Sequence, residues 1–253
     1  MQKKPKIIYY HDELNDEFSN DHIKAKKIDG SYQYLRGKAF HIFWYRIVAV
    51  PLAKLYMKLY FRHKIINNGV LEQAGKSGYF LYGNHTHFMA DALVPSMVSM
   101  PEDISVIVHP NNVSMPVLGK ITPYLGAIPL PDDKNAMKNF MSAVKYKIEN
   151  GENIMIYPEA HIWPYYTDIR PFKDTSFGYP VRYHTPVFCL TNTYQPGKGM
   201  KRPRMVTYVD GPFYPQEGLT LKEQRKNLRG QVYHVMKERA KNNTIERIHY
   251  EKW

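Results

Sequence analysis

Short apolar runs alternate with amphipathic stretches along most of the chain, beginning near residue 79. Six of these runs have the length of β-strands and are apolar at most successive positions, which is typical of strands covered on both faces of a sheet. They are Tyr79–Tyr82, Ile104–Val108, Ala127–Leu130, Ile154–Tyr157, Val187–Thr191 and Met205–Val209. The alternation predicts an α/β fold, in which a mostly parallel mixed sheet is flanked by helices.

Two longer stretches have the period of amphipathic helices. Lys134–Glu149 carries apolar residues at helical spacing, among them Phe140 and Val144. The sequence Thr220-Leu-Lys-Glu223 matches a capping box, in which the side chains of a Thr and a Glu three residues later satisfy free backbone donors. It predicts the start of a second helix, which continues to about Ala240.

The composition divides the chain into three parts. Residues 1–38 form a polar arm of mixed charge, in which Ile7–Tyr10 and Ser31–Leu35 are predicted as short strands. Residues 39–66 form an amphipathic segment with many aromatic side chains. Residues 67–253 carry the alternating pattern of the α/β domain.

The segment Ala39–Phe61 is the most apolar long stretch, but it does not read as a membrane span. A spanning helix needs about 20 mostly apolar residues, whereas Arg46, Lys54 and Lys58 interrupt this segment and Pro51 breaks it. We predict an interfacial helical segment, with aromatic anchors and with lysines that reach lipid phosphates. An amphipathic helix packed on the protein's own core fits the pattern equally well.

Composition and charge narrow the class of protein. The chain has 253 residues, of which 43% are hydrophobic, so it is long and apolar enough to bury a sizeable core. The net charge of +12 favours anionic partners such as nucleic acid, anionic lipid headgroups or phosphorylated substrates. The single cysteine, Cys189, excludes a disulfide framework, lies in an apolar run and fits a reducing compartment.

The stretch Gly83–Leu93, GNHTHFMADAL, concentrates the candidate chemistry. It places His85 and His87 ahead of one carboxylate, Asp91, and follows an apolar strand. A histidine held by an aspartate can take a proton from a hydroxyl near neutral pH. We expect His85 to lie in the first turn of the helix that follows the strand. The spacing also suits metal ligands or a structural pair, although the aspartate and histidine that continue the usual binuclear pattern are absent.

Further motifs follow in a fixed order. Ile154–Glu159 is an apolar strand that ends in Pro-Glu, Arg170–Asp174 contains Phe-Lys, and Thr185–Phe188 contains Pro-Val. Together with Asn84-His85 and Asp91, this order resembles the glycerolipid acyltransferase superfamily, which includes the 1-acylglycerol-3-phosphate (lysophosphatidic acid) acyltransferases. The resemblance extends from about Phe80 to Val187.

The resemblance implies a role for each matching residue. His85 would be the general base and Asp91 its orienting partner, with His87 as the alternative base. Substrate-binding roles would fall to five residues around them, with Glu159 shaping the acceptor site. These five are Asn84, Glu159, His161, Arg170 and Lys173.

This chain departs from the family pattern at three places. Between His85 and Asp91 it has one residue more than the family has, so a bulge is needed to bring them together. Pro131–Asp133 replaces an expected arginine of the second motif, for which Lys134 or Lys138 are substitutes. Ala160-His161-Ile162 replaces the glycine and arginine after the third-motif glutamate, so that His161, Arg170 or Lys173 would hold a phosphate.

The implied function is acyl transfer in phospholipid biosynthesis. The acyl group of a thioester, acyl-CoA or acyl-acyl carrier protein, would move to a hydroxyl of a lysophospholipid, with 1-acylglycerol-3-phosphate as the expected acceptor. No cofactor or metal is expected, and the enzyme would lie on the cytoplasmic side, bound peripherally to an anionic membrane. Two rivals remain: a metal-dependent hydrolase that uses His85, His87 and Asp91, and a non-enzymatic basic module that binds membrane or nucleic acid. Nucleic acid is not expected, because no recognition motif is present.

Overall fold

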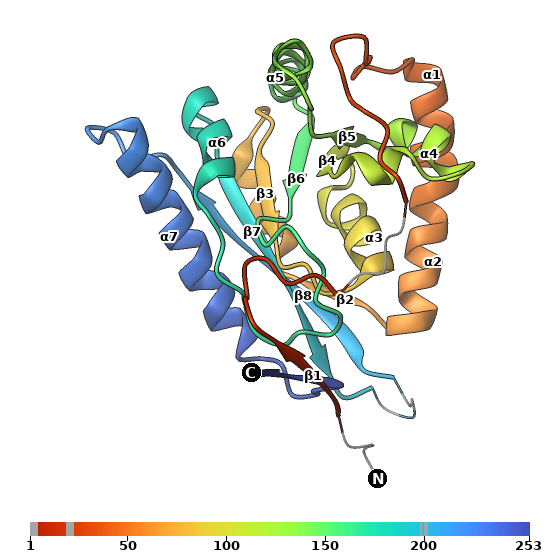
Figure 1. The fold of residues 1–253 in the computed structure, drawn as a ribbon, viewed down its shortest axis with the longest axis vertical. Helices are drawn as coiled ribbons and strands as arrows, with labels where there is room; N and C mark the ends of the chain where they lie inside the picture. The colour runs from red at the N-terminus through yellow and green to blue at the C-terminus, as the bar shows by residue number, and fades with distance from the viewer. Residues whose placement is uncertain (1–4, 19–22, 198, 200–201) are drawn as a thin grey trace.

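A seven-stranded sheet forms the centre of the molecule. The structure is a computed structural model that describes residues 5–18, 23–197, 199 and 202–253. The strand order of the sheet is β2-β8-β7-β3-β6-β4-β5 (Figure 1). Five strands run parallel: β3 (Phe80–Gly83), β4 (Ile104–Val108), β5 (Ala127–Pro129), β6 (Asn153–Ile156) and β7 (Val187–Gln195). β8 (Arg204–Phe213) runs antiparallel to β7, and β2 (Lys64–Ile66) runs parallel to β8.

The predicted mostly parallel mixed sheet is thereby confirmed, and all six predicted strands are present. β7 and β8 extend well beyond their predicted apolar runs, because the pairing continues to Gln195 in β7 and through Asp210 to Phe213 in β8. β2 was missed by the sequence analysis. It has three residues and lies at the edge of the sheet, so it lacks a run of buried apolar side chains.

Helices cover both faces of the sheet. α5 (Lys134–Glu149) and α7 (Leu221–Ala240) have the predicted bounds, and Thr220 and Glu223 form the predicted capping box. These two helices and α6 (Gly178–Tyr183) pack on the face that carries Phe80 and Tyr82. α2 (Val50–Phe61) and α3 (Phe88–Ser99) pack on the opposite face, against Leu81 and Leu190. Further short helical segments are α4 (Leu118–Ile121) and the 3₁₀ turns Asn68–Ala74, Pro110–Val113, Thr122–Leu125 and Thr175–Phe177.

The amphipathic segment is one continuous helical rod. α1 (Lys38–His41) passes into a π-helical stretch, Ile42–Ala49, and then into α2. The prediction that Pro51 breaks the helix is wrong: Pro51 is the second residue of α2, which follows the π-helical stretch without interruption. In the described part of the chain, no helix combines the length and the apolar character needed to cross a membrane.

This rod has two apolar sides. Met57 and Phe61 are fully buried against the body of the protein, as expected for an amphipathic helix on its own core. The outer side also carries apolar residues, with Leu52, Leu55 and Leu59 exposed by 60%, 54% and 67%. The interpretation as a helix packed on its own core is therefore confirmed for the inner side, and the interfacial interpretation stays a prediction for the outer side.

The N-terminal arm packs against the α/β body. β1 (Lys6–Tyr10) confirms the first predicted strand and pairs in parallel with β9 (Ile248–Lys252) near the C-terminus. The strand predicted at Ser31–Leu35 is wrong, because this stretch has no strand partner and instead places the Tyr34 ring edge-on against Phe140 at 5.7 Å. The arm thus contributes to the same core as the sheet.

Candidate active site

The turn between β3 and α3 positions the two histidines. β3 ends at Gly83, residues 84–87 are neither strand nor helix, and α3 begins at Phe88. His87 is the N-cap of α3, and its Nδ1 accepts a hydrogen bond from the backbone N–H of Ala90 at 3.3 Å. The expectation that His85 lies in the first turn of the helix is therefore wrong. It lies two residues before the cap, at the carboxyl end of β3.

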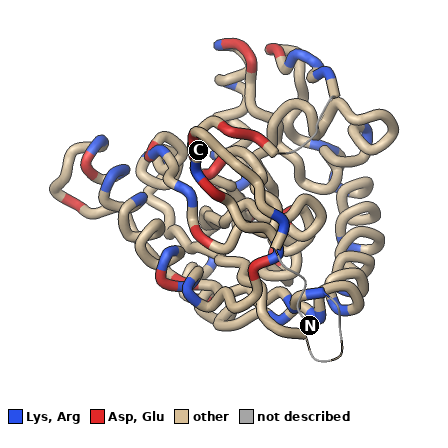
Figure 2. The backbone as a smooth tube through the Cα atoms, turned by 60° about the horizontal axis from the view of Figure 1, so that its bottom comes forward, with Lys and Arg blue, Asp and Glu red and all other residues tan. Residues whose placement is uncertain are grey.

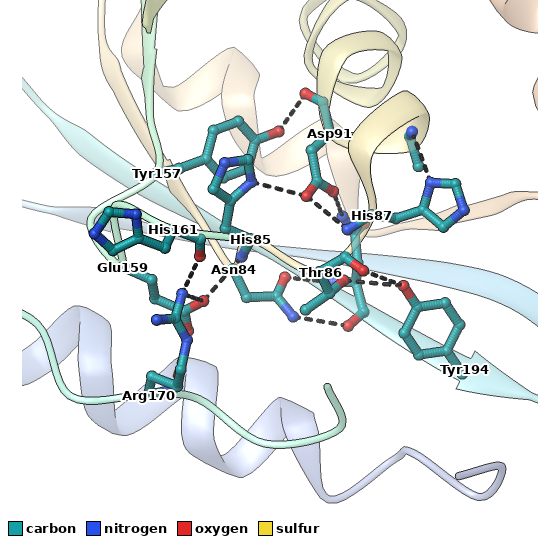
Figure 3. A network of polar contacts seen from close by, with 12 residues as sticks. Asn84, His85, Thr86, His87, Asp91, Tyr157, Glu159, His161, Arg170 and Tyr194 are labelled. Atoms are coloured by element: carbon teal, nitrogen blue, oxygen red, sulfur yellow. Dashed lines mark hydrogen bonds and ion pairs between the residues drawn. The ribbon is translucent and has the colours of Figure 1, made fainter. Parts of the chain in front are cut away.

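His85 and Asp91 are in direct contact. His85 Nδ1 lies 2.9 Å from Asp91 Oδ2, and the Asp91 side chain is 2% exposed, against 17% for His85 (Figure 3). Because a carboxylate only accepts, His85 donates its Nδ1–H and leaves Nε2 free to take a proton. The additional residue between the two is absorbed by the non-helical turn, so the structure brings them together as the resemblance requires.

Two further donors hold the carboxylate. The backbone N–H of His87 donates to Asp91 Oδ2 at 2.8 Å, as an amide near a helix N-terminus does. The side-chain amide of Asn192, on β7, donates to Asp91 Oδ1 at 3.4 Å. Asp91 is thus a buried acceptor whose orientation is set from several sides.

Tyr157 is a functional candidate that the sequence analysis missed. It follows β6, the strand next to β3, and its ring stacks on the His85 imidazole with 4.4 Å between centroids. Its hydroxyl donates to the backbone carbonyl of Asp91 at 2.5 Å. Burial raises the pKa of Tyr157 well above its usual value, so the hydroxyl stays a donor. The only signal in the sequence was an aromatic residue directly before Pro-Glu.

Glu159 and Arg170 form a buried pair beneath His85. Glu159 accepts the backbone N–H of His85 at 3.0 Å and that of Arg170 at 3.1 Å, and its carboxylate lies 3.5 Å from the guanidinium of Arg170. Burial raises the pKa of Glu159 and lowers that of Arg170. The Arg170 side chain has no exposed surface and also donates to the carbonyl oxygens of His161 and Glu13. It reaches His85 through Glu159 rather than facing solvent.

The other three predicted substrate-binding residues lie in different surroundings. Asn84 is 1% exposed, and its side chain exchanges two hydrogen bonds, of 3.0 and 2.8 Å, with the backbone of Asn192. The His161 ring is partly exposed and lies 3.6 Å from Glu17 of the N-terminal arm. Lys173 is exposed on the loop that follows Arg170. The structure therefore joins Asn84 and Glu159 to the His85–Asp91 pair and leaves His161 and Lys173 at the surface.

His87 is placed differently from His85. Its Nδ1 is occupied by the capping bond, its ring meets Phe61 and Tyr165 edge-on at 4.9 and 5.3 Å, and burial lowers its pKa. Figure 3 shows the two imidazoles on opposite sides of Asp91. Within the described residues, no three His, Cys, Asp or Glu side chains are grouped so that they could hold a metal ion. Of the two histidines, His85 is the one whose ring nitrogen bonds to the Asp91 carboxylate.

Comparison with known proteins shows the family of the chain. A family model described as Acyltransferase matches residues 62–191, just over half of the chain, including both histidines, Asp91, Tyr157 and Glu159. The chain belongs to this acyltransferase family. The resemblance inferred from the motifs is thus confirmed.

The fold of this acyltransferase is shared with a solved structure. The crystal structure of the 1-acyl-sn-glycerophosphate (LPA) acyltransferase PlsC from Thermotoga maritima matches it with a TM-score of 0.56 and 15% sequence identity. The match covers 78% of this chain and 81% of that one. None of the curated proteins compared with the chain matches it. The family model thus shows an acyltransferase, and the solved structure shows that the fold is shared.

Proposed function

We propose that this acyltransferase moves a fatty acyl group from a thioester to the hydroxyl of a lysophospholipid, with 1-acylglycerol-3-phosphate as the acceptor. The observation that carries the proposal is the 2.9 Å contact between His85 Nδ1 and Asp91, which leaves His85 Nε2 free as a base. The name of the Thermotoga maritima protein with the same fold supports the choice of acceptor.

The reaction needs one proton transfer in each direction. His85 Nε2 takes the proton of the acceptor hydroxyl while its oxygen forms a bond to the thioester carbonyl carbon. The carbon–sulfur bond then breaks, and the thiolate leaves with the proton that His85 returns. Asp91 stabilises the transient imidazolium and fixes the histidine tautomer, by the logic of other His–Asp pairs. No covalent intermediate with the enzyme forms.

The acceptor phosphate requires a cation near the surface. Among the three residues expected to hold it, Arg170 is enclosed with Glu159, whereas Lys173 is exposed and His161 is partly exposed. We therefore assign phosphate binding to Lys173 and His161. Arg170 would support the site by neutralising the carboxylate that holds the His85 backbone.

We further propose that the protein binds the cytoplasmic surface of an anionic membrane through the outer side of the α1–α2 rod. Its exposed leucines stand beside exposed Lys54 and Lys58, a combination suited to acyl chains and lipid phosphates. Figure 2 shows Lys and Arg residues spread over many segments rather than gathered in a single stripe, which does not favour a dedicated nucleic-acid surface.

The test is acyl transfer with detection of the released thiol, using acyl-CoA and acyl-acyl carrier protein as donors and several lysophospholipids as acceptors. His85→Ala is expected to lower kcat by about 10²–10⁴-fold, the usual contribution of a general base. His87→Ala should retain the activity to within a few-fold. Acceptor-dependent thiol release that resists chelators supports the proposal. Activity abolished by chelator and restored by metal would instead establish the metal-dependent hydrolase.

A further inference from the structure

A buried polar side chain reaches Asp91 from the sheet side. Asn192 has no exposed surface, and its amide nitrogen lies 3.4 Å from Asp91 Oδ1, the oxygen that bonds neither His85 nor the His87 backbone. The backbone of Asn192 is itself fixed to the side chain of Asn84, the residue before His85. Asn192 therefore contacts Asp91 through its side chain, and through its backbone it contacts Asn84 in the turn that carries His85.

Two more polar residues continue from Asn192 across the sheet. Thr207 on β8 pairs directly with Asn192 in the strand register and has no exposed surface. Its hydroxyl lies 2.6 Å from Asn192 Oδ1. On the other side, the same hydroxyl lies 2.7 Å from Nε2 of His63, the second residue after α2. The backbone N–H of His63 is fixed by a bond to the carbonyl of Met57 in that helix.

The chemistry of the groups sets the direction of every hydrogen bond. Asp91 can only accept, so the NH₂ group of Asn192 must face it and the amide oxygen must face Thr207. The Thr207 hydroxyl therefore donates to Asn192 and accepts from His63, which must carry its proton on Nε2. Burial lowers the pKa of His63 to about 4, so the ring keeps this single proton at neutral pH. The donors thus point one way, from His63 to Asp91.

We propose that Asn192 and Thr207, with His63 behind them, are positioning residues that hold the Asp91 carboxylate so that its Oδ2 faces His85. This inference rests on the proposed function. Without the Asn192 amide, Oδ1 would be a buried acceptor with a lost partner, and the carboxylate would turn to recover one. A turn of the carboxylate misaligns the imidazole, and small misplacements of a catalytic base are costly in rate. None of the three residues touches the substrate in this scheme.

The chain offers a matched set of substitutions for the test. Thr207→Val removes the hydroxyl and keeps the shape, whereas Thr207→Ser keeps the hydroxyl. The control is Thr191→Val on the neighbouring strand β7, since Thr191 is equally buried and its hydroxyl has no hydrogen-bond partner among the described residues. All three variants are compared with wild type for kcat, KM and thermal unfolding.

We expect Thr207→Val to lower kcat about tenfold while KM changes less than twofold, because only the alignment of the base is disturbed. Thr207→Ser should recover most of kcat, and Thr191→Val should match wild type. His63→Phe, which removes the next donor, should lower kcat about threefold and provides a second variant if Thr207→Val does not fold. Equal kcat values for Thr207→Val and Thr191→Val would overturn the proposal.

A second readout separates this inference from the proposed function. Nitrogen-15 NMR of His85 reports which ring nitrogen carries the proton, whatever reaction the enzyme catalyses. We expect the Nδ1–H form in wild type, Thr207→Ser and Thr191→Val, and a mixture of both forms in Thr207→Val. If wild type transfers no acyl group but the mixture appears, the positioning role stands and the proposed function fails. If wild type is active and the spectra of all four proteins agree, the positioning role fails alone.

Discussion

The ring of Tyr157 lies on the imidazole of His85, with 4.4 Å between the centroids and 16° between the planes. The same tyrosine donates its hydroxyl to the backbone carbonyl of Asp91 at 2.5 Å. One side chain thus contacts both members of the candidate catalytic pair, and it directly follows β6, an element to which neither of them belongs. The Tyr157 ring packs on the face of the His85 imidazole, and the Asp91 carboxylate bonds to the Nδ1 at the edge of the same imidazole.

The two contacts of Tyr157 can be tested separately. Tyr157→Phe keeps the stacked ring and loses the hydrogen bond, so we expect kcat to fall only a few-fold. Tyr157→Ala loses both, and we expect a loss of tenfold or more, because the imidazole is free to turn. The measurement is kcat and KM for acyl transfer in both variants. Equal losses in the two variants would show that the hydroxyl alone matters.

The Glu159–Arg170 pair predicts a large effect on stability. Arg170→Met leaves the carboxylate of Glu159 buried without its cation, and removing one partner of such a pair typically costs about 3–5 kcal/mol. Urea unfolding followed by circular dichroism measures the change. The control is Lys145→Met, which breaks an exposed i,i+4 pair with Glu149 and should leave the midpoint nearly unchanged. Similar midpoints for both variants would contradict the buried role of Arg170.

Much of the fold was readable in the sequence because its signals are local. The strands beside the site are short runs of buried apolar residues. The helix α5 was predicted from its helical period, and α7 from its Thr220 capping box. The pairing of β1 with β9 was not predicted, because it joins the two ends of the chain and depends on the finished fold. Local patterns contain no information on which distant strands become neighbours.

The same distinction applies to the site. His85 and Asp91 are near in sequence and carry a recognisable spacing, so their contact was predicted. The contribution of Asn192 depends on β7 lying next to β3, an order that no local pattern specifies. Arg170 was expected at a phosphate, since the arginine of the family pattern after the third-motif glutamate is replaced in this chain. Its burial against Glu159 follows only from the path of the loop in three dimensions.

The depressed pKa of His63 predicts a pH dependence of stability. Burial lowers it to about 4 from an ordinary value of 6.5, so the unfolded chain binds this proton more readily than the folded protein. Stability from this residue is complete above pH 6.5, decreases as the pH falls toward 4, and changes no further below that. His63→Gln should therefore flatten the loss of unfolding free energy between pH 7 and pH 4.5, measured by urea titration. Parallel curves for wild type and variant would contradict the assignment.

The outer side of the α1–α2 rod predicts how the protein meets a membrane. Leu55→Glu with Leu59→Glu places two carboxylates where exposed leucines now lie beside Lys54 and Lys58. Burying one leucine is worth about 1.5–3 kcal/mol, so losing two should reduce binding to vesicles by at least on the order of tenfold. The measurement is co-flotation with vesicles containing phosphatidylglycerol, at low and high salt.

A control on another surface tests whether an added carboxylate lowers vesicle binding wherever it is placed. Leu221→Glu changes an equally exposed leucine, 68% accessible, at the start of α7 on the opposite face of the sheet. It should bind vesicles nearly as wild type does, since its single added charge is screened within about 10 Å at 0.1 M salt. Acyl transfer to a short-chain, water-soluble acceptor should be unchanged in the rod variant, because the variant leaves His85 and Asp91 intact. If the rod variant floats with vesicles as wild type does, the membrane contact lies elsewhere on the molecule.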